Sequence, residues 1–232
     1  MTPRILRNTI VLALAFLSPA AFAQTNPQNS TPPATAADLE ELYTTTIEDR
    51  TADIIKALNI TNAETADTVH DLVIAQYRVM RARDALIDAQ LTAMGKEVNY
   101  ENRAGQLAAE SKPLHTWFFA KLSEKLTPDQ VETIKDKMTY NKVKVTYDAY
   151  VAIIPGLTDP EKAKMMDLLK AAREEAVDGG SAKEKSKIFQ KYKDQINDYL
   201  NASGHDVAKA YKDWEAKQPV AKAGGDAPLR QK

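Results

Sequence analysis

The chain has 232 residues and nearly balanced charge, with 31 lysines and arginines against 32 aspartates and glutamates. This balance argues against nucleic acid as a general partner and against a polybasic surface that would bind membranes. The chain contains no cysteine, so it can form no disulfide bond and has no cysteine for lipid attachment at an export cleavage site.

The first 23 residues predict a secretory signal peptide. Two arginines precede an apolar stretch over residues 10–16, and Ala21-Phe22-Ala23 forms a small-x-small cleavage site. The apolar stretch is shorter than the roughly 18 to 20 residues that a membrane-spanning helix needs. We therefore expect cleavage before Gln24, no membrane anchor in the mature chain, and a periplasmic or secreted protein.

Composition divides the rest of the chain into three parts. Residues 24–37 and 219–232 are rich in proline and in small or polar residues, so we expect a flexible linker and a disordered tail. Residues 38–218 contain no long Pro/Gly-rich break and are numerous enough for one domain with a hydrophobic core.

Helix starts are marked along residues 38–218. At four places a Ser or Thr is followed three residues later by a Glu or Gln, the pattern of a capping box: Thr61–Glu64, Thr127–Gln130, Thr158–Glu161 and Ser181–Glu184. Between these starts, apolar residues recur at spacings of three and four, as at Val69, Val73 and Tyr77. The sequence therefore predicts an all-α fold, a single domain of six to eight helices.

Strand-like alternation occurs in one place only, after the helix that starts at Thr127. Asn141 is expected to end this helix, because asparagine tolerates the left-handed conformation. Val143, Val145 and Tyr147 then alternate with polar residues. This alternation predicts an extended connector over residues 141–147, with one face buried.

Three tyrosines, Tyr140, Tyr147 and Tyr150, surround the predicted connector. One interpretation is that they pack against the core with their hydroxyls at the rim. The other is a ligand platform, because binding residues concentrate on loops held by a rigid scaffold. In the extended geometry Tyr147 would be the more buried of the first two and Tyr140 the more exposed.

Two long runs carry a resemblance to a known family. They are KLTPDQVETIKDKMTYNKVKVTYDAY at residues 125–150 and AREEAVDGGSAKEKSKIFQKYKDQINDYLNASGHDV at residues 172–207. They resemble the bacterial domain-of-unknown-function family 3826, and the resemblance covers nearly the whole mature domain. It implies an exported protein of about this size, loosely associated with the secreted repertoires of polysaccharide-degrading bacteria. The family offers no catalytic residues to carry over.

A shorter motif resembles a second group. LTPDQ at residues 126–130 is similar to the L-T-x-x-Q motif of the Spy/CpxP periplasmic stress chaperones, which are cradle-shaped helical proteins. The corresponding place at residues 157–161 departs from the motif, with Glu161 in place of glutamine. Those cradles look basic, whereas this chain is slightly acidic, and a capping box accounts for LTPDQ without a chaperone.

The sequence offers little catalytic chemistry. It contains no serine-hydrolase elbow, zincin motif, P-loop or dinucleotide fingerprint. Asp67 and His70 share a helix face, where we expect a local side-chain pair rather than a metal site. Glu174, Glu175 and Asp178 could supply acid–base carboxylates, although a solvated helix face is the simpler interpretation. We therefore predict neither a metal nor a cofactor.

Three functional classes remain. The sequence favours a noncatalytic binding or accessory protein, whose partner would be a periplasmic ligand or protein. A periplasmic chaperone would need an exposed apolar cradle. An enzyme acting on glycan fragments would need a deep pocket with clustered carboxylates, or an arginine such as Arg50, Arg81 or Arg173, beside aromatic rings.

Six side chains are candidates for ligand binding. Three surround the predicted connector, and the others are aromatic or cationic residues elsewhere in the domain: Tyr140, Tyr147, Tyr150, His115, Trp117 and Arg173. If they form one site, the tyrosine stretch and Trp117 will line a common cavity.

Overall fold

The computed structural model describes residues 35–218, and within them the chain forms eight α-helices and no β-strand. The helices are α1 (Ala36–Leu58), α2 (Ala63–Ala93), α3 (Tyr100–Ser123), α4 (Pro128–Met138), α5 (Lys142–Ile153), α6 (Asp159–Ala176), α7 (Ala182–Ala202) and α8 (Val207–Lys217). The predicted all-α fold of six to eight helices is confirmed.

The predicted signal peptide, the predicted tail and residues 24–34 of the predicted linker lie outside the described residues. The remainder of that linker is not a linker. Thr35 is the N-cap of α1, and it exchanges hydrogen bonds with Asp38 in a reciprocal capping box. The cap provides acceptors for the first free N–H groups of the helix, so α1 begins at Ala36, inside the predicted linker.

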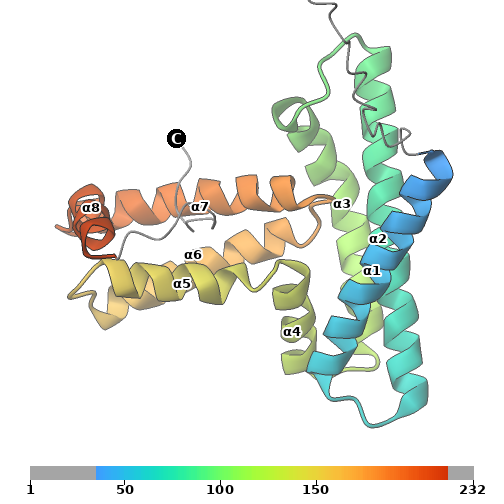
Figure 1. Ribbon diagram of the computed structural model, residues 1–232, viewed down its shortest axis with the longest axis horizontal. Coiled ribbons are helices and arrows are strands. Elements are labelled where there is room, and N and C mark those ends of the chain that lie inside the picture. Colours follow the sequence, from blue (N-terminus) through green and yellow to red (C-terminus); the bar gives the residue numbers. More distant parts are fainter. Residues whose placement is uncertain (1–34, 219–232) are drawn as a thin grey trace, which may run out of the picture.

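The helices form two groups that meet near one end of each (Figure 1). Helices α1, α2 and α3 run alongside one another, with α4 beside the lower part of α1. Helices α5, α6 and α7 run side by side across that direction, and α8 closes their far end. We call α1–α4 the first bundle and α5–α8 the second bundle.

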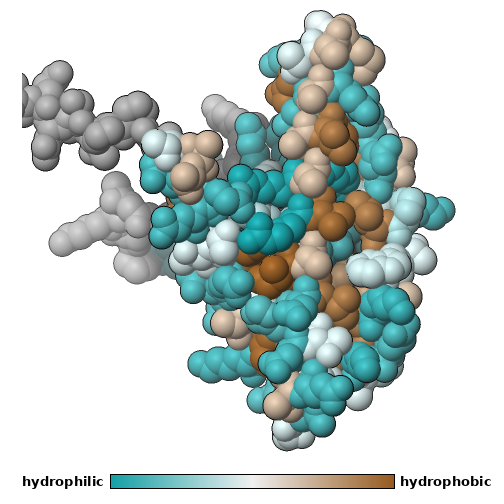
Figure 2. Space-filling view, turned by 90° about the vertical axis from the view of Figure 1, so that its right-hand side faces the viewer, coloured by the Kyte–Doolittle hydropathy of each residue, from teal (hydrophilic) through white to brown (hydrophobic). Residues whose placement is uncertain are grey.

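The outer face of α1 and α2 is mixed in character. Figure 2 shows apolar residues on this side of the molecule interspersed with hydrophilic ones. Exposed apolar side chains of these two helices include Leu39 and Leu42 of α1 and Val79 and Leu86 of α2. Scattered surface residues of this kind are normal for a globular protein.

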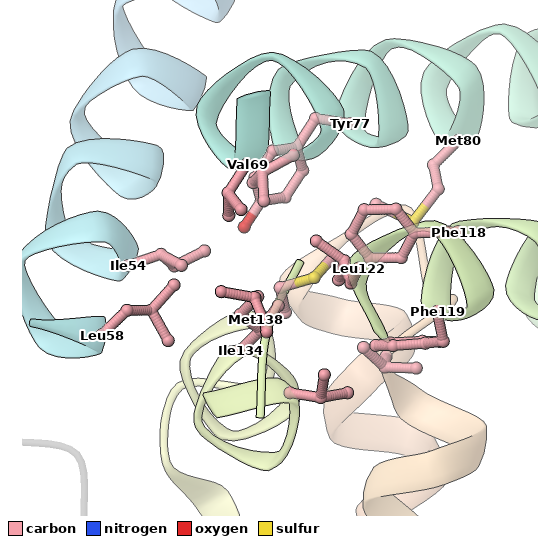
Figure 3. Packing of buried hydrophobic residues seen from close by; sticks show 14 of the residues in the cluster. Ile54, Leu58, Val69, Tyr77, Met80, Phe118, Phe119, Leu122, Ile134 and Met138 are labelled. Atoms are coloured by element: carbon pink, nitrogen blue, oxygen red, sulfur yellow. The ribbon is translucent and has the colours of Figure 1, made fainter. Parts of the chain in front are cut away.

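The core of the first bundle draws on all four of its helices (Figure 3). Phe118 and Leu122 of α3 and Ile134 of α4 are completely buried against α1 and α2. The predicted periodicity of α2 is confirmed, because Val69, Val73 and Tyr77 all contribute to this core. Burial of each such side chain contributes about 1.5 to 3 kcal/mol.

The core of the second bundle is centred on α6. Met165, Leu169 and Ala172 recur along its buried face and pack against α5 and α7. No residue of α8 is fully buried; Tyr211 and Trp214 are among its half-buried side chains that rest on this core. The second bundle is therefore most tightly packed around α6 and most loosely packed at α8.

The capping boxes predicted at Thr127, Thr158 and Ser181 are confirmed. The fourth prediction, at Thr61, is wrong. There the N-cap is Asn62, whose side chain accepts a hydrogen bond from the Thr65 N–H at 2.8 Å. Asparagine is at least as good an N-cap as threonine, so α2 starts one residue later.

The predicted extended connector at residues 141–147 is also wrong. The chain reverses within two residues, Tyr140 (φ 58°) and Asn141 (φ 53°), and re-enters a helix at Lys142. The left-handed conformation expected for Asn141 is confirmed. Helical spacing explains the burial that follows, because Val143 and Tyr150 face the core while Val145 is 52% exposed.

Candidate functional site

The bundles leave a cavity of about 360 Å³ where α3 meets the end of α6 and the start of α7. We call it the junction groove. Both polar and apolar side chains line it: Tyr100, Ala104, Leu107, Ala108, Ser111, Lys112, His115, Glu174, Glu175, Asp178, Gly179, Glu184 and Ile188. A concave site of this size, with a few convergent polar groups, is the usual form of a small-ligand site.

Helix α3 contributes one wall of the junction groove. Ala104, Ala108, Ser111 and His115 all line it, and they recur at spacings of three and four along this helix. Side chains at this spacing share one helix face. Because Ala104, Ala108 and Ser111 are small, this face of α3 leaves space for the groove. His115 is the one large side chain among the four.

His115 reaches across the junction to the turn between α6 and α7. Its Nδ1 lies 3.0 Å from Oδ2 of Asp178. Its ring also packs on Phe119, with 4.6 Å between the ring centroids. These contacts fix the orientation of the imidazole and leave Nε2 as the ring nitrogen without a protein partner among residues 35–218.

A buried arginine lies behind this wall. Arg83 of α2 is only 6% exposed. Its guanidinium donates to Ser111 Oγ at 2.7 Å, to Asp84 Oδ1 at 2.7 Å and to the Asp178 carbonyl oxygen at 2.8 Å. Arg83 thereby connects α2 and α3 to the α6–α7 turn and holds two groove-lining residues in place.

Glu184 makes a second connection across the junction. Its carboxylate accepts hydrogen bonds from the backbone N–H groups of Gly180 and Ser181, at 2.9 and 3.2 Å, and pairs with Arg103 of α3. Gly180 is needed for the close approach of the bundles, because a Cβ atom there would lie 1.7 Å from Asp84 Oδ2. The capping box of α7 therefore also joins the two bundles.

Lys185 is buried beneath the same turn. Its ammonium donates to the carbonyl oxygens of Ala176 and Val177, at 3.2 and 3.0 Å, which are the last carbonyls of α6. Burial disfavours the charged form and lowers the pKa of Lys185 to about 7. The lysine thus donates hydrogen bonds, from inside the protein, to carbonyl oxygens at the end of α6 that have no partner within the helix.

The carboxylates of the junction groove all pair with basic side chains. Glu174 lies 2.9 Å from the ammonium of Lys135. Glu175 lies 2.7 Å from that of Lys191 and accepts a hydrogen bond from the Tyr192 hydroxyl at 3.0 Å. Asp178 and Glu184 are paired in the same way, with His115 and Arg103. The groove therefore presents hydrogen-bond donors and acceptors side by side, rather than a surface of uniformly negative charge.

One known protein family matches most of the described helices. Residues 44–220 match the model of a family described as "Protein of unknown function (DUF3826)". The chain belongs to this family. The match covers all of the described helices except the first turns of α1. A search of curated proteins found no match.

The site residues expected from the sequence of this DUF3826 protein do not come together. His115 lines the junction groove, whereas Trp117, two residues further along α3, is 51% exposed and does not. Arg173 is 3% exposed and binds Asp136 Oδ1 at 2.7 Å, so it fastens α6 to α4. Its position indicates a structural role rather than ligand contact.

The three tyrosines are also separated. Tyr140 is 37% exposed, and the guanidinium of Arg50 lies 5.6 Å from its ring centre. Tyr147 is half-buried on the second core. Tyr150 is fully buried at the ring and lines a different cavity near α8. Tyr150, not Tyr147, is therefore the anchoring residue of this segment.

Other candidates from the sequence resolve as local pairs. His70 pairs with Glu48 at 2.9 Å and Asp71 at 3.2 Å, not with Asp67 as expected, and the hydrogen bond to the Asp71 carboxylate raises the pKa of His70. Within residues 35–218 no group of three or more His, Cys, Asp or Glu side chains could hold a metal ion. In the same residues no helix is long and apolar enough to cross a membrane.

Sequence reasoning missed Arg83 and Arg103, which organise the junction. Arg83 carried a local signal, because it lies three residues after Met80 and four before Ile87 on the buried face of α2. A charged residue on such a face needs a buried partner. The carboxylate partner is the neighbouring Asp84, but the Ser111 hydroxyl and the Asp178 carbonyl oxygen lie 28 and 95 residues away in the chain, so the sequence does not reveal these two contacts.

Proposed function

We propose that the protein is an exported, noncatalytic binding protein whose ligand, a saccharide fragment, occupies the junction groove. The observation that carries this proposal is the groove lining, in which paired donors and acceptors surround apolar residues beside the ring of Tyr100. A sugar has matching surfaces, because its hydroxyls both donate and accept hydrogen bonds and its C–H faces pack on aromatic rings.

The charge pattern favours binding over acid–base catalysis. The carboxylate of Glu175 pairs with the Lys191 ammonium, and that of Asp178 pairs with the His115 imidazole. Both are placed to accept hydrogen bonds from ligand hydroxyls, and each is fixed by a protein partner rather than aimed at a common reacting atom. These groups are therefore better suited to hold a sugar than to act as a general acid on it.

The buried connections support a preformed site. Arg83 fixes Ser111 and the Asp178 backbone, and Glu184 fixes the turn that carries Gly179 and Gly180. A groove whose walls are already ordered loses less conformational entropy when a ligand binds.

The chaperone alternative has less support. A client-binding cradle needs a large, continuous apolar surface. On the α1–α2 face, apolar residues are broken up by hydrophilic ones (Figure 2). Suppression of client aggregation by the purified protein would nevertheless favour that alternative over the present proposal.

Export is supported by the pattern of residues 1–23. We expect the mature protein to begin at Gln24 and to be recovered in the periplasmic or culture fraction. Mass spectrometry of the fractionated protein checks this. A chain that keeps Met1 and sediments with membranes would contradict it.

Saccharide binding is tested by filling the groove. Ala108 lines the groove on α3, so Ala108→Trp should block it. Ala109 is the next residue, is exposed and does not line the groove, so Ala109→Trp is the matched control. Calorimetric titration with neutral and acidic oligosaccharides should show binding to wild type and Ala109→Trp and its loss in Ala108→Trp.

Two outcomes would contradict this proposal. One is that wild type binds no oligosaccharide of the series at millimolar concentration. The other is that Ala108→Trp, with its helical circular dichroism intact, binds as tightly as wild type.

A further inference from the structure

A second cavity, of about 390 Å³, lies at the opposite end of the second bundle from the junction groove. We call it the distal cavity. Its walls come from the end of α5, the second half of α7 and the start of α8. Ile153, Ile154 and Val207 give it an apolar surface, and the rings of Tyr150 and Tyr211 also line it.

Two of the three side-chain amides that line the distal cavity, those of Asn197 and Asn201, already accept a hydrogen bond within the protein. Oδ1 of Asn197 accepts a hydrogen bond of 2.6 Å from the Tyr150 hydroxyl. Oδ1 of Asn201 accepts one of 3.1 Å from the backbone N–H of Val207. These bonds orient each amide, and the NH₂ group of each remains as a donor for a ligand.

Lys193 adds a positive charge to the same cavity. It lines the cavity, and among residues 35–218 its ammonium forms no ion pair or hydrogen bond. Asp194 beside it accepts instead from the Gln190 amide at 2.7 Å, and Lys142 of α5 contributes a second positive charge nearby. Desolvation, with the repulsion from Lys142, lowers the pKa of Lys193.

We propose that the distal cavity binds a small carboxylate with an aromatic or aliphatic body. The carboxylate accepts hydrogen bonds from the Lys193 ammonium and from the amides of Asn197 and Asn201, and the body packs between Ile153 and the tyrosine rings. An anion supplies what the cavity lacks, since a half-buried cation without a partner is costly and a charge-assisted hydrogen bond offsets that cost. This site is independent of the saccharide proposal.

The packing of α8 fits such a ligand. None of its residues is fully buried, so α8 makes few contacts that a ligand would have to displace. A ligand in the distal cavity touches Val207 and Ala208 at the start of α8 as well as α5 and α7. Binding therefore adds contacts that hold α8 to the bundle.

The test compares 4-hydroxyphenylacetate with its neutral amide by calorimetric titration into the full chain. The two molecules have the same body and differ in charge. We expect the carboxylate to bind at least about tenfold more tightly than the amide, as for a hydrogen bond to a charged group.

Three variants make the test specific. Lys193→Met keeps the length of the side chain and should reduce the preference for the carboxylate to about twofold or less. Lys212→Met removes an exposed charge of α8 outside the cavity and should leave the preference unchanged. Ala208→Trp fills the cavity and should abolish binding of both molecules.

The proposal is overturned if wild type binds neither molecule at millimolar concentration or binds both equally. It is also overturned if Lys193→Met keeps the preference, or if Ala208→Trp binds the carboxylate as wild type does. Circular dichroism establishes that each variant keeps its helices. A variant that unfolds is replaced by Lys193→Gln or Ala208→Leu under the same criteria.

Discussion

The two ends of the second bundle are held in place by different means. At the junction, Arg83, Arg103 and Glu184 connect helices through buried, charge-assisted hydrogen bonds. At the far end, α8 is held by half-buried side chains such as Tyr211 and Trp214. The charged hydrogen bonds fix the walls of the junction groove. The half-buried contacts leave a cavity beneath α8, which is only loosely packed on the bundle.

The difference shows how one small helical domain can support two kinds of site. A polar ligand such as a sugar needs donors and acceptors at fixed positions, and buried ion pairs provide fixed positions. A carboxylate with an apolar body needs an apolar cavity whose walls can adjust to its shape. A loosely packed helix such as α8 provides such a wall. We therefore expect the free energy of unfolding to depend on single buried charges at the junction more than at the α8 end.

The largest expected effect is at Arg83. Arg83→Ala leaves Asp84, Ser111 and the Asp178 carbonyl without their buried donor. Breaking a buried charge network in this way costs on the order of 3 to 5 kcal/mol. Urea denaturation should show this loss in the free energy of unfolding, together with loss of saccharide binding.

Arg78→Ala is the matched control for Arg83→Ala. Arg78 lies on the same helix, and its side chain is 46% exposed and paired with Glu40 at 2.9 Å. An exposed pair contributes about 1 kcal/mol or less. Equal losses from the two variants would remove the distinction that we draw between buried and surface charges.

A second effect concerns the pH dependence of stability at Lys185. Its pKa is about 7 in the folded protein, against an ordinary value of 10.5. Between these values the unfolded chain binds more protons than the folded chain, so this group makes stability rise with pH from about 7 to about 10.5. Below pH 7 both states are protonated, and its contribution to the slope disappears.

Lys185→Met should flatten this rise. Denaturation curves at several pH values between 7 and 10 measure the slope for wild type and variant. Lys187→Met, on the same helix with an exposed side chain, is the control and should keep the wild-type slope. A wild-type slope that survives in Lys185→Met would mean that another group is responsible.

Local structure was largely predictable from the sequence, because caps and apolar spacing act within a few residues. Thr127, Thr158 and Ser181 were recognised as N-caps for this reason. The prediction of an extended connector after Asn141 is wrong because the spacing of Val143, Val145 and Tyr147 fits the pattern of a strand as well as that of a helix. Burial decides between the two, and burial of Tyr150 depends on α7, which the local pattern does not contain.

The candidate sites were less predictable. The sequence predicts His115 as a candidate ligand-binding residue, and it presents Asp178 only as one of three carboxylates near the end of a helix. The contact between them spans 63 positions of the chain. Pairings between residues so far apart in the sequence depend on how the two bundles pack against each other. Local patterns of charge or hydrophobicity do not predict this packing.

The most direct test of the saccharide site is amide NMR of the full chain, titrated with the oligosaccharide that binds most tightly in calorimetry. Our account predicts that chemical-shift changes concentrate at Tyr100, His115 and Gly179 around the junction groove, and that residues 207–217 of α8 stay unchanged. Changes confined to α8 or to the α1–α2 face, with the groove residues unmoved, would contradict it.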